Sequence, residues 1–293
     1  MRILCWNCRG LGSNATVGEL RWLVRVHRPS LLFLSETKMR DFRVRSFMWS
    51  LGYSGCFAVS SAGQSGGLAL FWLMSVSVTV KPCNARCIDV HITPENGIKW
   101  RATFVYGEPR REHRSEFWEF LRFMRSTWNG PWICYGDFNE VLSQDEHIGP
   151  RDRTEAQINA FQECLQDCEL MDLGFLGPKF TWSNRQDADS NVRVRLDRAI
   201  ANGDFSRMFQ DCSVENLITT SSDHYAILIS LLGSSRDFVH TPVQQGFRFE
   251  AMWLRAPDYR EVLEKAWTDG SDGQWSLQST WANLSRTATS LKD

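Results

Sequence analysis

Short apolar runs that stop at polar residues recur along the chain as far as residue 232. Runs of this length, bounded by Pro or Gly, are typical of buried strands. We predict such strands at residues 2–6, 31–34, 66–72, 76–80, 87–93, 99–106, 131–135, 180–183, 192–200 and 226–232. Residues 99–106 alternate apolar and polar side chains, which predicts a strand with only one face buried.

Between these runs, three segments repeat apolar residues at helical spacing, at residues 16–28, 115–128 and 154–168. Thr16 with Glu19, and Thr154 with Gln157, have the spacing of a capping box, in which each side chain satisfies a free backbone N–H at the start of the helix. Strands that alternate with helices predict a layered α/β fold.

The composition changes near Gly233. Residues 233–246 are rich in Gly, Ser, Pro and Gln, and a Trp-containing stretch follows. We therefore predict one domain at residues 1–232, and a linker with a helical C-terminal extension at residues 233–293.

Composition limits the class of protein. The chain has 293 residues, of which 43% are hydrophobic, enough for one large domain or two small ones. Its net charge of -1 gives no global argument for binding nucleic acid, so such an argument must be local. No apolar stretch is long enough to span a membrane, and the N-terminus lacks a signal-peptide pattern, so we expect an intracellular protein.

The chain has nine cysteines, an odd number, and several lie inside apolar runs. This pattern favours free, buried thiols in a reducing compartment, without a disulfide. Cys5 and Cys8 have the spacing of zinc ligands, but Cys5 lies within a predicted strand, so a zinc site is not the favoured interpretation.

Polar residues with useful chemistry lie at the ends of the apolar runs. They are Asn7, Glu36, Tyr106, Asp137, Asn139, Asp197, Asp223 and His224. Strand ends at one edge of a layered α/β protein meet on one surface, so these side chains are predicted to gather there. Carboxylate and amide oxygens suit a hard ion such as Mg²⁺ better than zinc.

Five motifs in order give a specific resemblance. They are Trp6-Asn7-Cys8-Arg9-Gly10, Leu34-Ser35-Glu36-Thr37-Lys38, Gly136-Asp137-Phe138-Asn139-Glu140, Arg195-Leu196-Asp197-Arg198 and Ser222-Asp223-His224. The chain resembles the endonuclease/exonuclease/phosphatase superfamily over residues 1–232. The amino-acid sequence of its motifs is most similar to that of the endonuclease domain of plant LINE-type (non-LTR) retrotransposon polyproteins. The resemblance implies a two-sheet sandwich flanked by helices, in four layers, like the apurinic endonucleases and DNase I.

The resemblance also implies roles for the residues. Glu36 would be the main Mg²⁺ ligand, assisted by Asn7 and Asp223, and Mn²⁺ could substitute. Asp137 would align or deprotonate the attacking water, and Asn139 would position the same group. His224 would contact the scissile phosphate in an orientation fixed by Asp197, and Tyr106 would contact the phosphate or the leaving group.

Arginines near these motifs suggest a DNA surface. They lie after Tyr106 and along the hairpin at residues 181–200: Arg110, Arg111, Arg114, Arg185, Arg193, Arg195 and Arg198. Such clusters neutralise phosphates and position a duplex, although a solvated charged face would give the same pattern.

The favoured function is therefore a Mg²⁺-dependent endonuclease that nicks DNA and leaves a 3′-hydroxyl primer, in the nucleus by resemblance. Gly107-Glu108-Pro109 follows Tyr106 where repair enzymes carry an Asn, which counts against an abasic-site role. Two alternatives stay open: a phosphatase or phosphodiesterase of the same superfamily that acts on a small molecule, a lipid or RNA, and an inactive retroelement remnant. Oligomeric state and target sequence are open as well.

Overall fold

The computed structural model describes residues 1–231, apart from residues 64, 83, 94–96, 151 and 188–189, together with residue 265. The predicted extension at residues 233–293 therefore lies outside the described residues, except for residue 265. Everything below concerns the described part of the chain.

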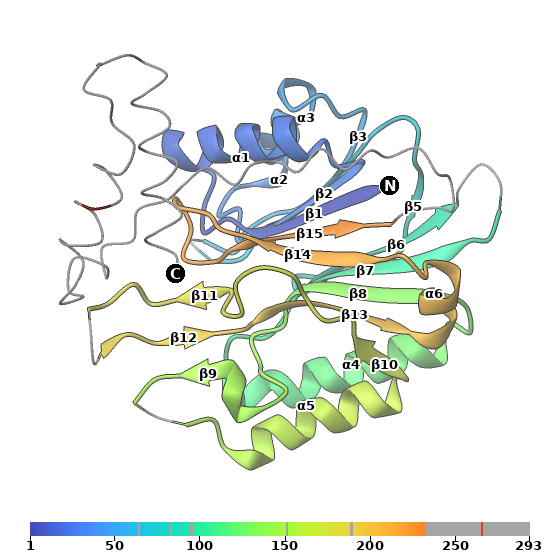
Figure 1. Cartoon of the computed structure of the whole chain (residues 1–293). Coiled ribbons are helices and arrows are strands. Elements are labelled where there is room, and N and C mark those ends of the chain that lie inside the picture. Colours follow the sequence, from blue (N-terminus) through green and yellow to red (C-terminus); the bar gives the residue numbers. More distant parts are fainter. Residues whose placement is uncertain are drawn as a thin grey trace. The chain divides into compact units, whose positions relative to one another are not determined.

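Two mixed sheets of six strands pack face to face (Figure 1). The first has the order β14 (Ser213–Leu217), β15 (Ala226–Ser230), β1 (Arg2–Asn7), β2 (Leu31–Ser35), β4 (Leu68–Trp72) and β3 (Gly55–Val59). The second has the order β10 (Leu170–Asp172), β13 (Asp197–Asn202), β8 (Trp132–Asp137), β7 (Trp100–Tyr106), β6 (Cys87–Thr93) and β5 (Ser77–Val80). In each sheet one central pair is parallel, β1 with β2 and β7 with β8.

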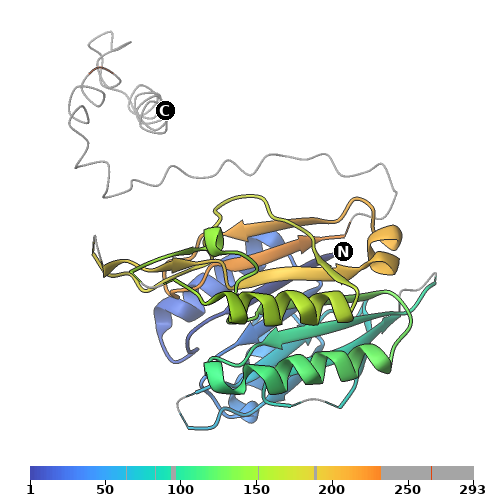
Figure 2. The same ribbon diagram turned by 90° about the horizontal axis from the view of Figure 1, so that it is seen from below.

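Helices cover the outer face of each sheet. Next to the first sheet lie α1 (Asn14–His27), α2 (Asp41–Arg45) and α3 (Phe47–Ser50). Next to the second lie α4 (Arg114–Ser126) and α5 (Glu155–Asp167), side by side in the view from below (Figure 2). Shorter helical segments are η1 (Arg111–His113), η2 (Gln144–Glu146) and α6 (Gly203–Met208). The predicted four-layer sandwich is confirmed.

Three buried clusters correspond to the three interfaces between the layers. The largest fills the space between the sheets, where Phe33 of β2 packs against Phe104 of β7 with ring centroids 5.2 Å apart. A second joins the first sheet to α1–α3, and a third joins the second sheet to α4 and α5, where Trp118 stacks on Phe161. Apolar burial on both faces of both sheets is the main stabilising term of such a fold.

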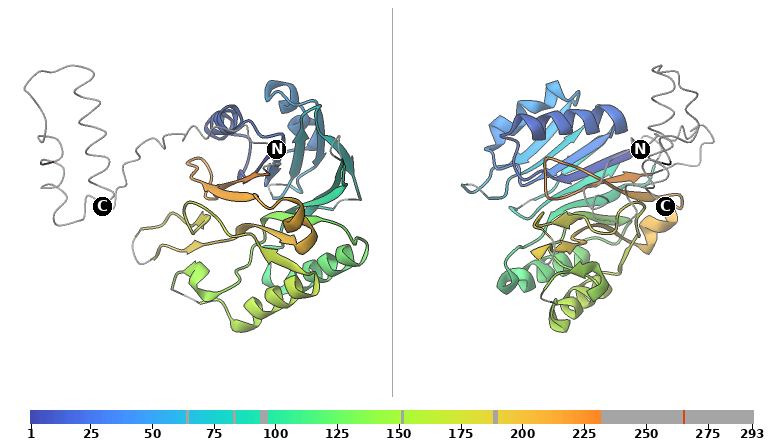
Figure 3. Two further views of the ribbon diagram at one scale, coloured as in Figure 1. Left: turned by 45° about the vertical axis from the view of Figure 1, so that its right-hand side comes forward. Right: turned by 60° about the vertical axis from the view of Figure 1, so that its left-hand side comes forward.

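A small third sheet extends the sandwich at one end. It consists of β11 (Trp182–Ser183), β12 (Arg193–Val194) and β9 (His147–Ile148). The β11–β12 hairpin projects beyond the ends of the two large sheets (Figure 3). A backbone bridge between Trp182 and His224 connects this hairpin to the strand ends of the first sheet.

Two predictions about local structure need correction. Ser13, not Thr16, caps α1: the Thr16 N–H donates to Ser13 Oγ at 3.0 Å, and the carboxylate of Glu19 turns to a distant loop instead. The strand at residues 99–106 is buried on both faces, because α4 covers its outer side, where Arg101 pairs with Asp89 at 2.9 Å. The second predicted capping box, on α5, is present.

The predicted return strand at residues 192–200 is divided. It forms β12 and β13, and Arg195 and Leu196 lie between them, so the chain passes from the small sheet into the large one. Four strands were not predicted: β3, β9, β10 and β14. They are edge strands of their sheets, with at most two buried residues each. The apolar pattern of β9, β10 and β14 is short or weak, whereas β3 contains an apolar run at residues 56–59.

Candidate active site

Site residues from both large sheets meet at the end of the sandwich that carries the β11–β12 hairpin. Asp137 is the last residue of β8, and its backbone is paired with Asp197 of β13 on one side and with Tyr106 of β7 on the other. In the first sheet, Asn7 ends β1, and Glu36 follows β2. The structure therefore brings the ends of these strands together, as predicted from the sequence.

The backbone around these positions is constrained. Gly136 has φ +137°, and a Cβ there would lie 2.1 Å from the carbonyl oxygen of Val105. Glu36 and Asn139 take left-handed φ values of 50° and 57°, which are unusual for residues other than glycine. Non-glycine residues held in this region cluster at functional sites, where surrounding contacts compensate for the strain.

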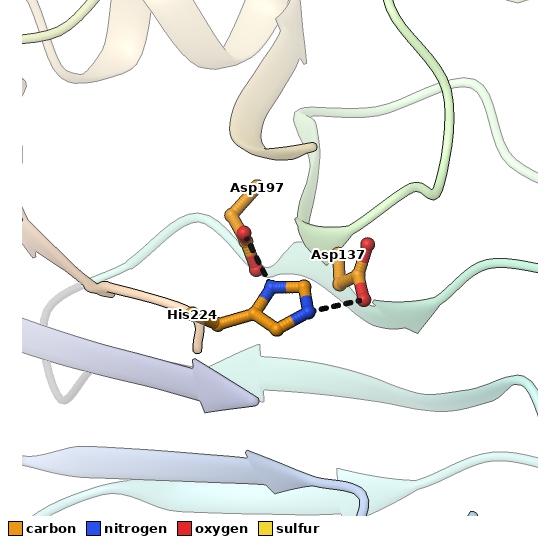
Figure 4. Close-up of side chains that lie close together, drawn as sticks. All are labelled: Asp137, Asp197 and His224. Carbon is orange, nitrogen blue, oxygen red and sulfur yellow. Dashed lines mark hydrogen bonds and ion pairs between the residues drawn. The ribbon is translucent and has the colours of Figure 1, made fainter. Parts of the chain in front are cut away.

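His224 lies between two carboxylates (Figure 4). Its Nδ1 is 2.9 Å from Oδ2 of Asp197, and its Nε2 is 3.8 Å from Oδ2 of Asp137. All three residues are at most 3% exposed. Thr181 donates its hydroxyl to the same Asp197 oxygen at 2.7 Å, so Asp197 is fixed from two directions.

Burial and neighbouring charges shift the pKa values of both His224 and Asp137. Burial by itself lowers the pKa of His224, but the carboxylates of Asp197 and Asp137 outweigh it and raise that pKa to about 9. Burial raises the pKa of Asp137 to about 7, against the opposing effect of the imidazolium. Between these values the pair is an imidazolium beside a carboxylate.

Asn7 and Tyr106 link this group to Glu36. The amide nitrogen of Asn7 lies 2.9 Å from Asp137 Oδ2, 3.2 Å from Glu36 Oε1 and 3.4 Å from His224 Nε2. The hydroxyl of Tyr106 donates to Glu36 Oε1 at 3.2 Å. Burial, followed by the charges of Glu36 and Asp137, raises the pKa of the Tyr106 phenol, so it stays a donor.

Arg9 bridges the two remaining acidic groups. Its Nη1 is 3.1 Å from Glu36 Oε2, and its Nε is 3.1 Å from Asp223 Oδ1. The other Asp223 oxygen accepts a hydrogen bond from Trp182 Nε1 at 3.0 Å. Lys38 adds a second cation, 3.5 Å from Glu36 Oε2. Arg9 and Lys38 were not among the predicted site residues, although both lie inside the motifs that carried the resemblance.

Asn139 takes a more distant place than predicted. Its side-chain amide donates to the carbonyl of Gly107 at 3.0 Å, and its backbone N–H donates to Asp137 Oδ1 at 2.9 Å. Through these two bonds, Asn139 ties the loop after β7 to the end of β8 and orients the Asp137 carboxylate.

The donor set fits a hard divalent cation. One oxygen each of Asp137 and Asp197 lies within 4.8 Å of the other and of His224, which as an imidazolium has no lone pair for a metal, and Glu36 and Asp223 already share one positive group, the guanidinium of Arg9. Carboxylate oxygens in this number are typical of Mg²⁺ and Mn²⁺ sites. Asn7 presents its NH₂ group to the site while its oxygen accepts from the Arg9 N–H, so its amide would have to turn over to serve as a ligand.

The cysteines among the described residues offer no comparable set. The thiol of Cys5 lies in the core between the sheets, whereas Cys8 belongs to the cluster under α1, where its thiol donates to the carbonyl of Ser35. The two side chains therefore point to opposite faces of the first sheet, and the zinc spacing does not correspond to a shared site. The eight cysteines among the described residues have free thiols.

Some of the predicted DNA-contacting arginines are structural. Arg114 is buried and forms an ion pair with Glu140. Arg195 is buried with its guanidinium 2.6 Å from Glu146 and 2.8 Å from Asp172. Because these charges are already paired inside the protein, the prediction that they contact DNA needs correction. Arg198 is fully buried in the same network as Arg195.

Four of the predicted arginines are exposed: Arg110, Arg111, Arg185 and Arg193. The guanidinium of Arg193 lies over the ring of Phe180, 5.3 Å from its centroid. Arg185 donates to the carbonyls of Thr220 and Ser222, so it also supports the loop that carries Asp223 and His224.

Comparison with known proteins shows the family of the chain. The family model described as "Endonuclease/Exonuclease/phosphatase family" matches residues 4–224. The chain belongs to this family, and the match supports phosphodiester hydrolysis as its chemistry. No curated protein matches the sequence. Within the described residues, no helix has the length and apolar character needed to cross a membrane.

Solved structures share the fold at low sequence identity. A 3′-5′ exonuclease (NExo) from Neisseria meningitidis has 19% identity and a TM-score of 0.60, covering 79% of this chain and 99% of its own. The endonuclease domain of TRAS1, a telomere-specific non-LTR retrotransposon, has 15% identity and a TM-score of 0.60, covering 80% and 99%. An AP endonuclease from Archaeoglobus fulgidus has 15% identity and a TM-score of 0.61, covering 79% and 99%.

Proposed function

We propose that this chain is a Mg²⁺-dependent endonuclease that nicks DNA and leaves a 3′-hydroxyl end, as the endonuclease domain of a non-LTR retrotransposon would. The observation that carries the proposal is the buried Asp137–His224–Asp197 group beside Glu36. The likeness to the TRAS1 endonuclease domain supports the retrotransposon assignment. Exposed Arg110, Arg185 and Arg193 supply positive charge for DNA phosphates.

In this proposal Asp137 orients and deprotonates the attacking water. A general base works best when its pKa is near the operating pH, and the pKa of Asp137 is raised to about 7. The Asn139 N–H donates to the carboxylate at 2.9 Å, which fixes the direction in which it accepts a proton.

His224, held as an imidazolium by Asp197, stabilises the negative charge that develops on the phosphate oxygens. Tyr106 donates its hydroxyl near Glu36 and would contact the phosphate or the leaving oxygen. A divalent cation held by Glu36 and Asp223, with Asn7 after its amide turns over, would act as a Lewis acid on the same group.

A plasmid assay tests the proposal. Supercoiled plasmid should become nicked circles with Mg²⁺ and stay intact with EDTA. The nicked ends should be extended directly by a DNA polymerase, because extension requires a free 3′-hydroxyl. Ends that need prior removal of a 3′-phosphate would contradict the proposal, as would a folded protein that does not nick.

A second candidate is the removal of phosphate from a DNA 3′ end. It is favoured by the likeness to the 3′ phosphatase NExo from Neisseria, solved with a product DNA hairpin, at 18% identity and a TM-score of 0.61. An oligonucleotide with a 3′-phosphate separates the two: release of inorganic phosphate without plasmid nicking would favour this candidate.

A further inference from the structure

A cavity lies next to the candidate active site, on the side of α2. Its volume is about 340 Å³, and its lining includes Lys38, Arg40, Phe42, Arg43 and Ser61. It combines three cationic side chains with an exposed aromatic ring and contains no acidic side chain in its lining. None of the residues proposed above to carry the reaction lines it.

The cavity has a rigid base. The Lys38 N–H donates to the Gly66 carbonyl at 3.0 Å, and the Ser61 N–H donates to the Met39 carbonyl at 3.0 Å. Lys38 itself takes a left-handed φ of 52°. The segment after β2 is therefore fixed against the β3–β4 connection, and the cavity does not depend on a bound molecule to form.

Phe42 is exposed although its helix is anchored. Val44, two residues on, is fully buried in the cluster beneath α1–α3, whereas Phe42 is 61% exposed. A large aromatic ring left in water beside a cavity is a suitable surface for stacking a nucleobase. The nearby carboxylate of Asp41 is occupied, because it accepts from Ser60 Oγ at 2.9 Å and lies 3.7 Å from Arg45.

Lys38 connects the cavity to the reaction centre. Its side chain lines the cavity, and its Nζ is 3.5 Å from Glu36 Oε2. The cavity is therefore one side chain away from a proposed metal ligand.

We propose that this cavity binds the nucleotide next to the cleaved phosphodiester, with its phosphate on Arg40 and Arg43 and its base against the ring of Phe42. The inference rests on the proposed DNA-cleaving function. In this proposal α2 and the segment before it contribute to the cut-site preference of the enzyme. The reason is that stacking strength and backbone flexibility differ between DNA sequences.

Binding without cleavage tests the inference. In an Asp137→Asn background, the Kd for a fluorescein-labelled oligonucleotide is measured by anisotropy as a function of salt. Phe42→Ala should raise Kd about tenfold, and Phe42→Trp should keep the affinity, because it keeps the stacking surface. Arg40→Gln with Arg43→Gln should reduce the slope of log Kd against log salt by about 0.9, the loss of one phosphate contact.

Matched controls are available away from the site. Phe123→Ala removes a ring that is 63% exposed on α4. Arg2→Gln with Arg207→Gln removes two exposed cations, at the start of β1 and in α6. Both should bind like the parent.

If the cavity variants bind like these controls, the inference is overturned, even when the wild-type chain nicks plasmid. Loss of affinity confined to the cavity variants supports it, and this result does not require that nicking occurs. A mapped shift in cut-site preference of Phe42→Ala in the active background would be expected alongside the loss of affinity.

Discussion

The Nδ1 atom of His224 lies 2.9 Å from Oδ2 of Asp197, and both side chains are buried at the end of the sandwich. This pairing makes the imidazole much more basic than usual, with a pKa raised to about 9. NMR of labelled histidine should find this pKa in metal-free protein. In Asp197→Asn it should fall, because the carboxylate that raises it most is lost while burial still lowers the pKa. An unchanged pKa in Asp197→Asn would contradict the pairing.

The same pairing links stability to pH. Because the folded pKa of His224 is above the unfolded value, its contribution is complete below about pH 6.5 and is lost as pH rises through about 9. In EDTA, the free energy of unfolding of the wild type should therefore exceed that of Asp197→Asn most below pH 6.5. The difference should shrink by about 3 kcal/mol towards pH 9.5. Urea unfolding at the two pH values measures it, and a difference that grows with pH would reverse the sign.

Arg9 should compete with the divalent cation. Its guanidinium bridges Glu36 and Asp223 at 3.1 Å to each, so a cation that takes these oxygens must displace it. Arg9→Gln should bind Mn²⁺ about tenfold more tightly, which corresponds to removal of a partly exposed ion pair. Electron paramagnetic resonance of free Mn²⁺ measures this affinity directly. Arg45→Gln, which removes an exposed arginine paired with Asp41, is the control, and weaker Mn²⁺ binding by Arg9→Gln would contradict the prediction.

Glu19 should position the loop that carries His224. Its carboxylate accepts from the backbone N–H groups of Thr220 and Ser221 at 2.7 Å each. Glu19→Ala should lower kcat about tenfold with little change in KM, since the loop binds no substrate by itself but places His224. Amides 220 and 221 should also exchange hydrogen faster. Glu163→Ala, at an exposed position of α5, is the control, and slow exchange at both amides of Glu19→Ala would count against this role.

Gly136 should be required for the end of β8. A Cβ there would meet the Val105 carbonyl at 2.1 Å, and the φ of +137° is unfavourable for any other residue. Gly136→Ala should lower the free energy of unfolding by about 3 kcal/mol or more. Gly18→Ala is the matched control, because nothing lies within 4 Å of its added Cβ and alanine favours the helix; it should be neutral or stabilising by about 1 kcal/mol. Equal stability of the two variants would contradict this account.

The sequence pattern predicted the layers and the convergence of the site because both depend on local signals. Apolar runs locate the strands, and Asn7, Glu36, Asp137 and His224 each lie next to one of them. The two sheets then bring these ends together without further information. Edge strands such as β9 and β14 were missed because few of their residues are both apolar and buried, which weakens the apolar pattern.

Long-range partners could not be predicted in the same way. Arg195 looked like a DNA contact until the fold placed Glu146, 49 positions earlier, beside it. Glu19 looked like part of a helix cap until its partners proved to be 201 and 202 positions away. The charge of a side chain is visible in the sequence, but the residue that pairs with it depends on the completed fold.

The most direct test of the central claim is the initial rate of plasmid nicking by Asp137→Asn, compared with Asp145→Asn, an exposed aspartate paired with Lys179. The account predicts that Asp137→Asn nicks at least about 100-fold more slowly in Mg²⁺ while it keeps its affinity for DNA, and that Asp145→Asn behaves like the wild type. Nicking by Asp137→Asn at the wild-type rate would contradict it.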